Sequence, residues 1–261
     1  MGPRLVEDYL AYLAASGRRA TSNARAFAAI RGLHRFCVDE RGAGSDPTEG
    51  LSGPRLPQPI PKALSEEDVE LLLSAVVGDD PKARRDRLVL ELLYATGMRI
   101  SELASLRLSD LDVGRQMALV FGKGSKERIV PFGRHARLAL EAWLAPGGRP
   151  AMAPERWARR ADEESLLISS RGRRMSRQTV WVVVRTAATK VHLEDKVTPH
   201  VLRHSCATHL LEHGADIRVV QELLGHAAIT TTQIYTKVSN ELLRREYEAA
   251  HPRARGRYPA K

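Results

Sequence analysis

The residues best suited to chemistry gather between positions 198 and 235. Basic side chains recur there at His200, Arg203 and His226, and Tyr235 closes the segment. Guanidinium and imidazole groups donate hydrogen bonds well to phosphate oxygens. The segment therefore carries the side chains of a phosphate-binding site, with a hydroxyl that could act as a nucleophile.

Two helices are expected to hold these side chains. Thr198 followed by Pro199 predicts a helix start, because threonine caps N-termini and proline is favoured at the first helical position. His200 and Arg203 are three residues apart, so we expect them on one face of that helix. Gly225 is expected to end a second helix.

A further cation, Arg99, lies upstream of this segment. The helical pattern of residues 84–106 breaks at Thr96–Gly97, which places Arg99 at the start of a new helix. Arg99 could be a surface residue paired with Glu102, or a cation aimed into a cleft between helices.

Lys123 occupies the predicted turn of a β-hairpin. Residues 117–132 are rich in Val, Ile and Phe on either side of Gly122–Ser125, which predicts two strands joined at the glycines. Lys123 could be a solubilising turn lysine, or an ammonium that a flexible hairpin delivers to a bound substrate. The motif is too short for a P-loop.

The combined set suits the transfer of a phosphodiester. It comprises Arg99, Lys123, His200, Arg203, His226 and Tyr235. Two arginines can fork onto the non-bridging oxygens, a histidine can add a hydrogen bond, and a lysine can protonate the departing 5′ oxygen. A tyrosine, with an ordinary pKa of ~10, needs a base or a cationic setting to react. The sequence has no clustered Asp or Glu residues for magnesium, so we expect no metal and no cofactor.

A proline-rich stretch divides the chain into two domains. Residues 54–61 favour an extended linker. Residues 1–53 predict a small helical unit, with helices at 4–16 and from a cap at Thr21 to about residue 40. Residues 62–261 form the larger domain, which a capping signature at Ser65 opens.

Within the larger domain the pattern is mainly helical around the hairpin. Residues 145–165 are expected to form a surface excursion, and residues 166–168 a short strand. The fold class is therefore mainly α with a small antiparallel β-sheet. No internal repeat is present.

Charge favours a polyanionic partner. The chain has a formal net charge of +10, and a basic run precedes a helix that Ser176 is expected to cap. The candidate DNA contacts in this region are Arg173, Arg174, Arg177, Gln178 and Arg185. A run of this kind could also be a solvated face.

Two cysteines, Cys37 and Cys206, lie far apart, and neither belongs to a CxxC motif. Neither a disulfide framework nor a cysteine zinc site is indicated, and a reducing cytosol fits. The N-terminal residues lack a signal-peptide pattern, and no run is long enough to span a membrane. The expected location is the cytoplasm.

The motifs resemble those of tyrosine recombinases, the phage-integrase-like superfamily. They are ATGMRISEL, GKGSKERIVPF, TPHVLRHSCATHLL, LLGH and TTQIYT, in that order. The resemblance is strongest to bacterial Xer site-specific recombinases, of the XerD subtype. It implies a catalytic domain of that family at 62–261, behind a helical SAM-like core-binding domain.

The resemblance also implies roles. Tyr235 would attack the scissile phosphate and form a 3′-phosphotyrosyl intermediate, Lys123 would protonate the 5′-hydroxyl, and His200 would assist proton transfer at the tyrosine. The other donors, Arg99, Arg203 and His226, would hold the phosphate. Four protomers would act on two duplexes through a Holliday junction, without ATP or metal, in the resolution of chromosome dimers at cell division. The resemblance also implies two protein partners, a homologous recombinase and a DNA translocase activator.

The two ends of the chain lead to separate structural expectations. Family core-binding domains carry about four helices, and this chain starts where the third is expected, so the N-terminal domain is expected to be truncated. The C-terminal residues 237–254 predict an amphipathic helix with Val238, Leu242 and Tyr247 on one side. The resemblance implies that this helix docks on a neighbouring protomer; packing within its own chain is the alternative.

Three other functions remain open at this point. A mobile-element integrase or transposase would use the same residues on other DNA sites. A DNA-binding protein without catalysis would fit the short N-terminal domain. Histidines 200, 204, 209 and 213 could be zinc ligands, although the sequence offers neither an HExxH base nor a third ligand type.

Overall fold

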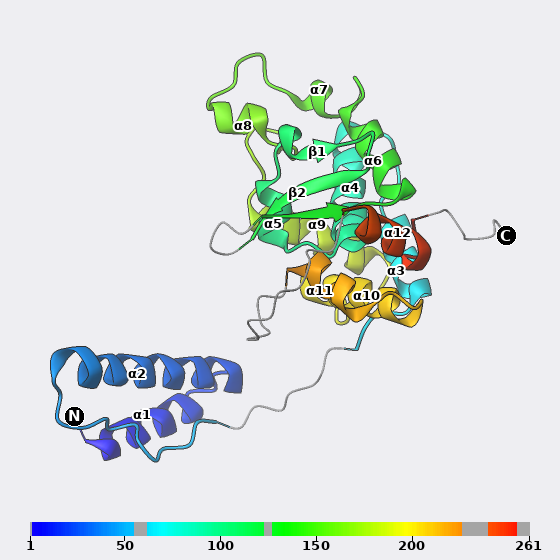
Figure 1. Cartoon of the computed structure of the whole chain (residues 1–261). Coiled ribbons are helices and arrows are strands. Elements are labelled where there is room, and N and C mark those ends of the chain that lie inside the picture. The colour runs from blue at the N-terminus through cyan, green and yellow to red at the C-terminus, as the bar shows by residue number, and fades with distance from the viewer. Residues whose placement is uncertain (1, 55–61, 123–126, 226–239, 255–261) are drawn as a thin grey trace. The chain divides into compact units, whose positions relative to one another are not determined.

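The computed structural model describes residues 2–54, 62–122, 127–225 and 240–254. The chain forms two compact units, Met1–Ile60 and Pro61–Lys261 (Figure 1). Among the described residues, no helix has the length and apolar character needed to cross a membrane.

The first unit consists of α1 (Pro3–Ala15) and α2 (Ala20–Arg41). Val6 and Leu13 of α1 are buried, and so is Phe27 of α2, whereas Leu33 is 60% exposed. Two helices can bury only one stripe of each against the other, so the apolar residues of α2 are covered only in part. The predicted cap at Thr21 is wrong: α2 begins after Arg19, and no side chain caps it.

The second unit carries the remaining elements. They are α3 (Glu66–Ser74), α4 (Pro81–Thr96), α5 (Ile100–Ser105), η1 (Leu108–Asp110), β1 (Leu111–Asp112), β2 (Met117–Phe121), β3 (Glu127–Pro131), α6 (Arg134–Leu144), α7 (Arg149–Met152), α8 (Arg160–Glu164), α9 (Arg177–Lys190), α10 (Pro199–Glu212), α11 (Ile217–Leu224) and α12 (Asn240–Ala250).

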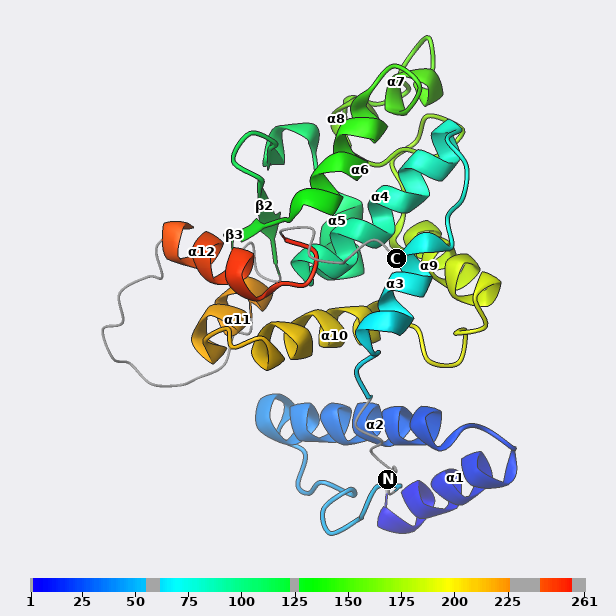
Figure 2. The ribbon, with the colours of Figure 1, turned by 90° about the vertical axis from the view of Figure 1, so that its right-hand side faces the viewer.

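Helix α4 is the centre of the second unit. Its residues 88–96 are all buried, because α6, α9 and α10 pack against it from different sides (Figure 2). A helix that is covered all round needs apolar residues all round, and the sequence LVLELLYA supplies them. Asp80 caps its N-terminus ahead of Pro81, and Gly97 ends it in the left-handed conformation, with φ 57°.

The sheet has three antiparallel strands in the order β1-β2-β3. The predicted hairpin is confirmed: Met117 pairs with Pro131, and Val120 pairs with Arg128. The predicted turn includes Lys123, which lies outside the described residues. Strand β1 was not predicted, since two residues give no alternation to recognise.

The segment at 145–168 differs from its prediction. Arg149 is buried, donates a hydrogen bond to the Ser165 carbonyl at 3.1 Å, and lies over the Trp157 ring at 5.2 Å. The segment expected to be a surface excursion is therefore held in place by the contacts of the buried Arg149. Residues 166–168 are buried but make only an isolated bridge, between Ile168 and Arg174, so the predicted strand is wrong.

Three helix starts follow the capping residues predicted from sequence. The Ser65 side chain accepts from the Asp68 amide, Ser176 from Thr179, and Thr198 from Val201. Asp216, at the start of α11, accepts from the Arg218 amide. Gly225 ends α11 in the left-handed conformation, as predicted.

Helix α12 packs on its own unit in this single chain. It contacts β3, α10 and α11, and its buried residues are Leu243, Tyr247 and Ala250. The prediction is confirmed for Tyr247, whereas Leu242 is only half-buried and its neighbour Leu243 is buried instead. Val238 lies outside the described residues.

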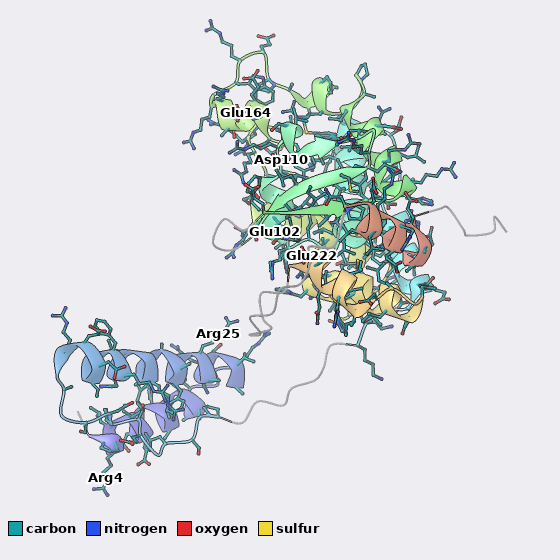
Figure 3. All side chains as sticks on the ribbon, in the orientation of Figure 1. Arg4, Arg25, Glu102, Asp110, Glu164 and Glu222 are labelled. Atoms are coloured by element: carbon teal, nitrogen blue, oxygen red, sulfur yellow. The ribbon has the colours of Figure 1, made fainter. Side chains whose placement is uncertain are left out.

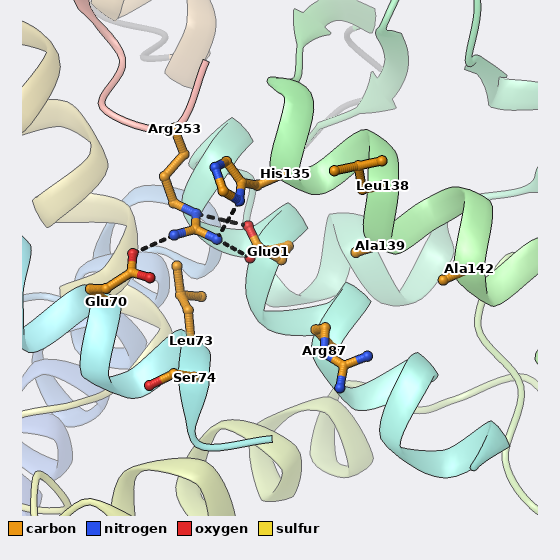
Figure 4. A pocket seen from close by; sticks show the side chains of 10 residues that line it. All are labelled: Glu70, Leu73, Ser74, Arg87, Glu91, His135, Leu138, Ala139, Ala142 and Arg253. Atoms are coloured by element: carbon orange, nitrogen blue, oxygen red, sulfur yellow. Dashed lines mark hydrogen bonds and ion pairs between the residues drawn. The ribbon is translucent and has the colours of Figure 1, made fainter. Parts of the chain in front are cut away.

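The chain after α12 is held by Arg253. Its guanidinium donates to both oxygens of Glu91, to Glu70, and to His135 Nδ1 at 2.9 Å (Figure 4). Burial by itself would lower the pKa of Arg253, but the charges of Glu91 and Glu70 outweigh it and hold this pKa above its ordinary value. These contacts fix the C-terminal segment to α3, α4 and α6.

His251 makes this anchor sensitive to acid. It stacks on Tyr247 at 4.7 Å, accepts from the Arg253 amide at Nδ1, and donates from Nε2 to the Tyr94 carbonyl. Burial lowers the pKa of His251 from 6.5 to about 3. Between those two pH values, His251 therefore binds a proton in the unfolded chain but not in the folded chain.

We accordingly expect His251 to reduce the free energy of unfolding as pH falls from 6.5 towards 3, by at most ~1.4 kcal/mol per pH unit. Tryptophan fluorescence reports on the second unit alone, because Trp143, Trp157 and Trp181 all lie in it. In a His251→Phe variant this part of the pH dependence should disappear, whereas His34→Gln in the first unit should leave it intact. An unchanged slope in His251→Phe would contradict the assignment.

Candidate active site

Arg99 stands at the break between α4 and α5. It is the N-cap residue of α5, where its amide donates to Glu102 Oε2 at 2.7 Å and its Nη1 to Glu102 Oε1 at 2.9 Å. The Arg99 side chain nevertheless keeps 41% of its surface exposed. The pairing of Arg99 with Glu102 is confirmed, whereas a role of Arg99 toward a bound ligand stays a prediction.

Arg203 lies in α10 and is buried, with 8% of its surface exposed. Its Nη1 donates to the Gly97 carbonyl and its Nη2 to the Leu224 carbonyl, both at 2.6 Å. The guanidinium therefore joins the end of α4 to the end of α11, whose terminal carbonyls have no partner within their own helices. A Cβ on Gly97 would lie 2.7 Å from Leu224 Cδ2, so glycine permits this approach.

The charge of Arg203 is not neutralised by a carboxylate in the part of the chain that the structure describes. Burial, with the nearby charge of Arg99, lowers the pKa of Arg203 from 12.5 to about 10, which still leaves it charged at neutral pH. A buried cation without a counter-ion is costly unless an anion approaches it. The binding of an anion by Arg203 stays a prediction, with which its burial and charge are consistent.

Glu102 is the carboxylate around which the arginines are arranged. Its side chain is 3% exposed, and Arg128 of β3 donates to both of its oxygens, at 3.0 and 2.7 Å. Burial alone would raise the pKa of Glu102, but the hydrogen bonds from Arg128 and Arg99 outweigh it and hold this pKa below its ordinary value. In Figure 3 Glu102 is labelled near the end of the sheet that approaches α11.

Of the remaining predicted catalytic residues, His200 alone lies among the described residues. His200 lies in the first turn of α10 and is exposed, so it does not share the buried environment of Arg203, although both belong to one helix. Gly225 is the last described residue before His226. Lys123, His226 and Tyr235 lie outside the described residues.

The predicted DNA contacts fall into two groups. Arg177 and Gln178 are exposed at the start of α9, and Arg173 is exposed beside Asp162, at 3.4 Å. Arg174 is also exposed, but it donates from Nε to the Ala104 carbonyl at 2.9 Å, and the half-buried Arg185 donates to the Glu194 carbonyl. The last two side chains are therefore engaged in holding the fold.

Zinc binding by the α10 histidines is disfavoured by their contacts. His209 accepts from the Tyr94 hydroxyl at Nδ1 and donates from Nε2 to the Leu64 carbonyl, both at 2.9 Å. Neither ring nitrogen is left for a metal ion. His213 hydrogen-bonds the His209 carbonyl and lies 3.2 Å from Glu66.

Sequence reasoning missed Arg128 and undervalued Glu102. A signal for Arg128 was present: it lies two residues before the buried Val130, so both side chains point to the same face of β3. A charged residue on the buried face of a strand needs a partner. Glu102, at the third position of the helix that Arg99 caps, was the carboxylate available.

Comparison with known proteins bears on the chemistry of this arrangement. Residues 62–241 match the Phage integrase family. The chain belongs to the phage integrase family. Tyrosine recombinase XerD of Halalkalibacterium halodurans is 46% identical over 246 residues, covering 94% of this chain and 80% of that protein. Tyrosine recombinase XerD of Mycobacterium tuberculosis is 48% identical over 240 residues, covering 90% and 76%.

Solved structures show the same fold. The crystal structure of XerA recombinase shares 31% identity, with a TM-score of 0.56, over 95% of this chain and 82% of that one. XerH site-specific recombinase, bound to palindromic difH substrate in a post-cleavage complex, shares 24% identity, with a TM-score of 0.70, over 95% and 72%. The resemblance to phage integrases and the fold class are confirmed, and this chain is a tyrosine recombinase that acts in site-specific DNA recombination.

Proposed function

We propose that this tyrosine recombinase cleaves and rejoins DNA strands through a 3′-phosphotyrosyl intermediate and resolves chromosome dimers. The observation that carries the chemistry is the pair Arg99 and Arg203 near the α4–α5 break. Arg99 is partly exposed, and Arg203, which donates to the Gly97 carbonyl, is buried and forms no ion pair with a carboxylate among the described residues. The relatives named XerD support the chromosomal role over that of a mobile-element integrase.

In the proposed reaction, Tyr235 Oη attacks the scissile phosphorus and the bond from phosphorus to the 5′ oxygen breaks. Lys123 gives its proton to that oxygen, which leaves as a 5′-hydroxyl. Arg99, Arg203 and His226 donate hydrogen bonds to the non-bridging oxygens, and His200 takes part in proton transfer at the tyrosine. Attack by a 5′-hydroxyl on the phosphotyrosine reverses these steps, so the phosphodiester energy is retained without ATP.

The wider setting follows from the same proposal. The unit at 1–53 would grip the DNA core site, the linker 54–61 would join it to the catalytic domain at 62–261, and Arg173, Arg177 and Gln178 would contact the duplex. DNA and a multimeric assembly are the partners of this chemistry. The proposal also includes a homologous recombinase in the tetramer, with α12 docked in trans, and a translocase activator. The reaction would take place in the cytoplasm.

Covalent trapping tests the chemistry. A nicked suicide duplex, built on the inverted-repeat site that the protein selects from genomic fragments, loses a short 5′-hydroxyl strand and so prevents rejoining. We expect a covalent protein–DNA species on a denaturing gel, in undiminished yield with EDTA. Loss of the species with EDTA would indicate a metal mechanism. Tight binding of the duplex without any adduct would indicate a DNA-binding protein that has lost catalysis.

A further inference from the structure

Arg128 is the most completely engaged arginine near the candidate active site. Its side chain is 8% exposed, its Nη1 and Nη2 donate to the two oxygens of Glu102, and its Nε donates to the Leu223 carbonyl at 2.8 Å. One side chain from β3 thereby holds both α5 and the end of α11. The proposed chemistry assigns it no part.

Glu102 is shared equally between Arg128 and Arg99. Oε1 accepts from Nη1 of each arginine, at 3.0 and 2.9 Å. Oε2 accepts from Arg128 Nη2 and from the Arg99 amide, both at 2.7 Å. Every strong acceptor position of the carboxylate is occupied, which fixes where it can hold the guanidinium of Arg99.

From this geometry we propose that Arg128 is a positioning residue for the recombination reaction, which acts on the scissile phosphate through Glu102 and Arg99. The inference rests on the proposed function, because it takes Arg99 as a phosphate ligand. Arg128 itself faces Glu102 and Leu223 rather than solvent, so it is not proposed to touch the DNA.

The charge balance explains why a second arginine is needed. A single carboxylate facing Arg99 alone would neutralise it and compete with phosphate for its donors. With Arg128 bound to the same carboxylate, one negative charge faces two guanidiniums, and Arg99 retains positive charge for a ligand. Arg99, Glu102 and Arg128 also all lie close enough to Arg203 to act on its pKa.

The contact with α11 adds a second effect at the same site. The Arg128 side chain packs beneath the end of this helix, where a Cβ on Gly225 would lie 3.1 Å from Arg128 Cδ. Gly225 has a φ of 65° and immediately precedes His226. The Nε bond to Leu223 therefore fixes the helix end that leads to a proposed phosphate ligand.

Single-turnover cleavage of the nicked suicide duplex tests the inference. Arg128→Ala should lower the cleavage rate constant by roughly 10–100-fold, by analogy with the loss of residues that orient metal ligands, with a much smaller change in Kd for the duplex. Arg128→Lys, which keeps the charge but cannot fork, should recover only part of the rate. Arg137→Ala, which removes an exposed pairing with Glu141, is the matched control and should cleave at the unmodified rate.

A double-variant cycle separates positioning from a general loss of folding. If Arg128 acts through Arg99, adding Arg128→Ala to Arg99→Ala should slow cleavage far less than it does in the unmodified protein. A misfolded fraction would lower the amplitude of cleavage and leave the rate constant unchanged. Multiplicative effects in the double variant, or an Arg128→Ala rate within twofold of the unmodified rate, would overturn this inference alone. An unmodified protein that forms no adduct would overturn the proposed function and this inference with it.

Discussion

A Tyr235→Phe variant is expected to form no covalent adduct with the suicide duplex while binding it almost as tightly as the unmodified protein. Phenylalanine preserves the ring but lacks the oxygen that would attack phosphorus, so the loss is complete rather than partial. DNA affinity arises mainly from many Lys and Arg contacts with phosphates, and one hydroxyl contributes little to that sum. A denaturing gel measures the adduct, and a salt titration measures binding.

The control is another tyrosine-to-phenylalanine change, made outside the proposed catalytic residues. Tyr247 of α12 is buried and stacks on His251 through its ring, which phenylalanine keeps, so Tyr247→Phe should leave both the adduct and the salt dependence of binding as they are. If the adduct persisted in Tyr235→Phe, a different side chain would be the nucleophile. If both binding and adduct were lost, Tyr235 would be acting in DNA recognition or folding.

The features that could be predicted from sequence are those fixed by local rules. Thr198, Ser176 and Ser65 cap helices because a hydroxyl satisfies free amides in the first turn, whatever the helix packs against. Gly97 and Gly225 end helices because the left-handed conformation favours glycine. These rules predict Arg99 at a helix start and Arg203 within a helix, and the structure confirms both positions.

The features that could not be predicted depend on partners distant in sequence. Arg128 lies within the motif GKGSKERIVPF, but its partners Glu102 and Leu223 are distant in sequence, so only the approach of α5 and α11 to β3 reveals its role. The glycines and prolines around Arg149 show no helical or strand period, so the sequence predicts a surface excursion there. In the structure Arg149 is buried and donates to the carbonyls of residues 163 and 165. Local pattern does not encode such long-range pairs.

The second large effect is expected at Arg203. Arg203→Lys should lower the single-turnover cleavage rate by roughly 10²–10³-fold, the cost of removing one donor aimed at a developing oxyanion. A lysine supplies one charge at one point, so it cannot satisfy the carbonyls of both Gly97 and Leu224 and also meet a phosphate. The Kd for the duplex should rise by less than tenfold, because other cations still contact the backbone.

Arg149→Lys is a closely matched control for Arg203→Lys. Arg149 is also buried, also donates to backbone carbonyls, and also has its pKa lowered by burial, but it lies between α6 and α8, away from the candidate site. Both variants should lose a similar amount of stability, of the order of 1–3 kcal/mol for each carbonyl left unsatisfied. Thermal unfolding followed by tryptophan fluorescence measures that loss. Only Arg203→Lys should slow cleavage by folded protein; equal slowing in both would show that stability, rather than a phosphate contact, explains the effect.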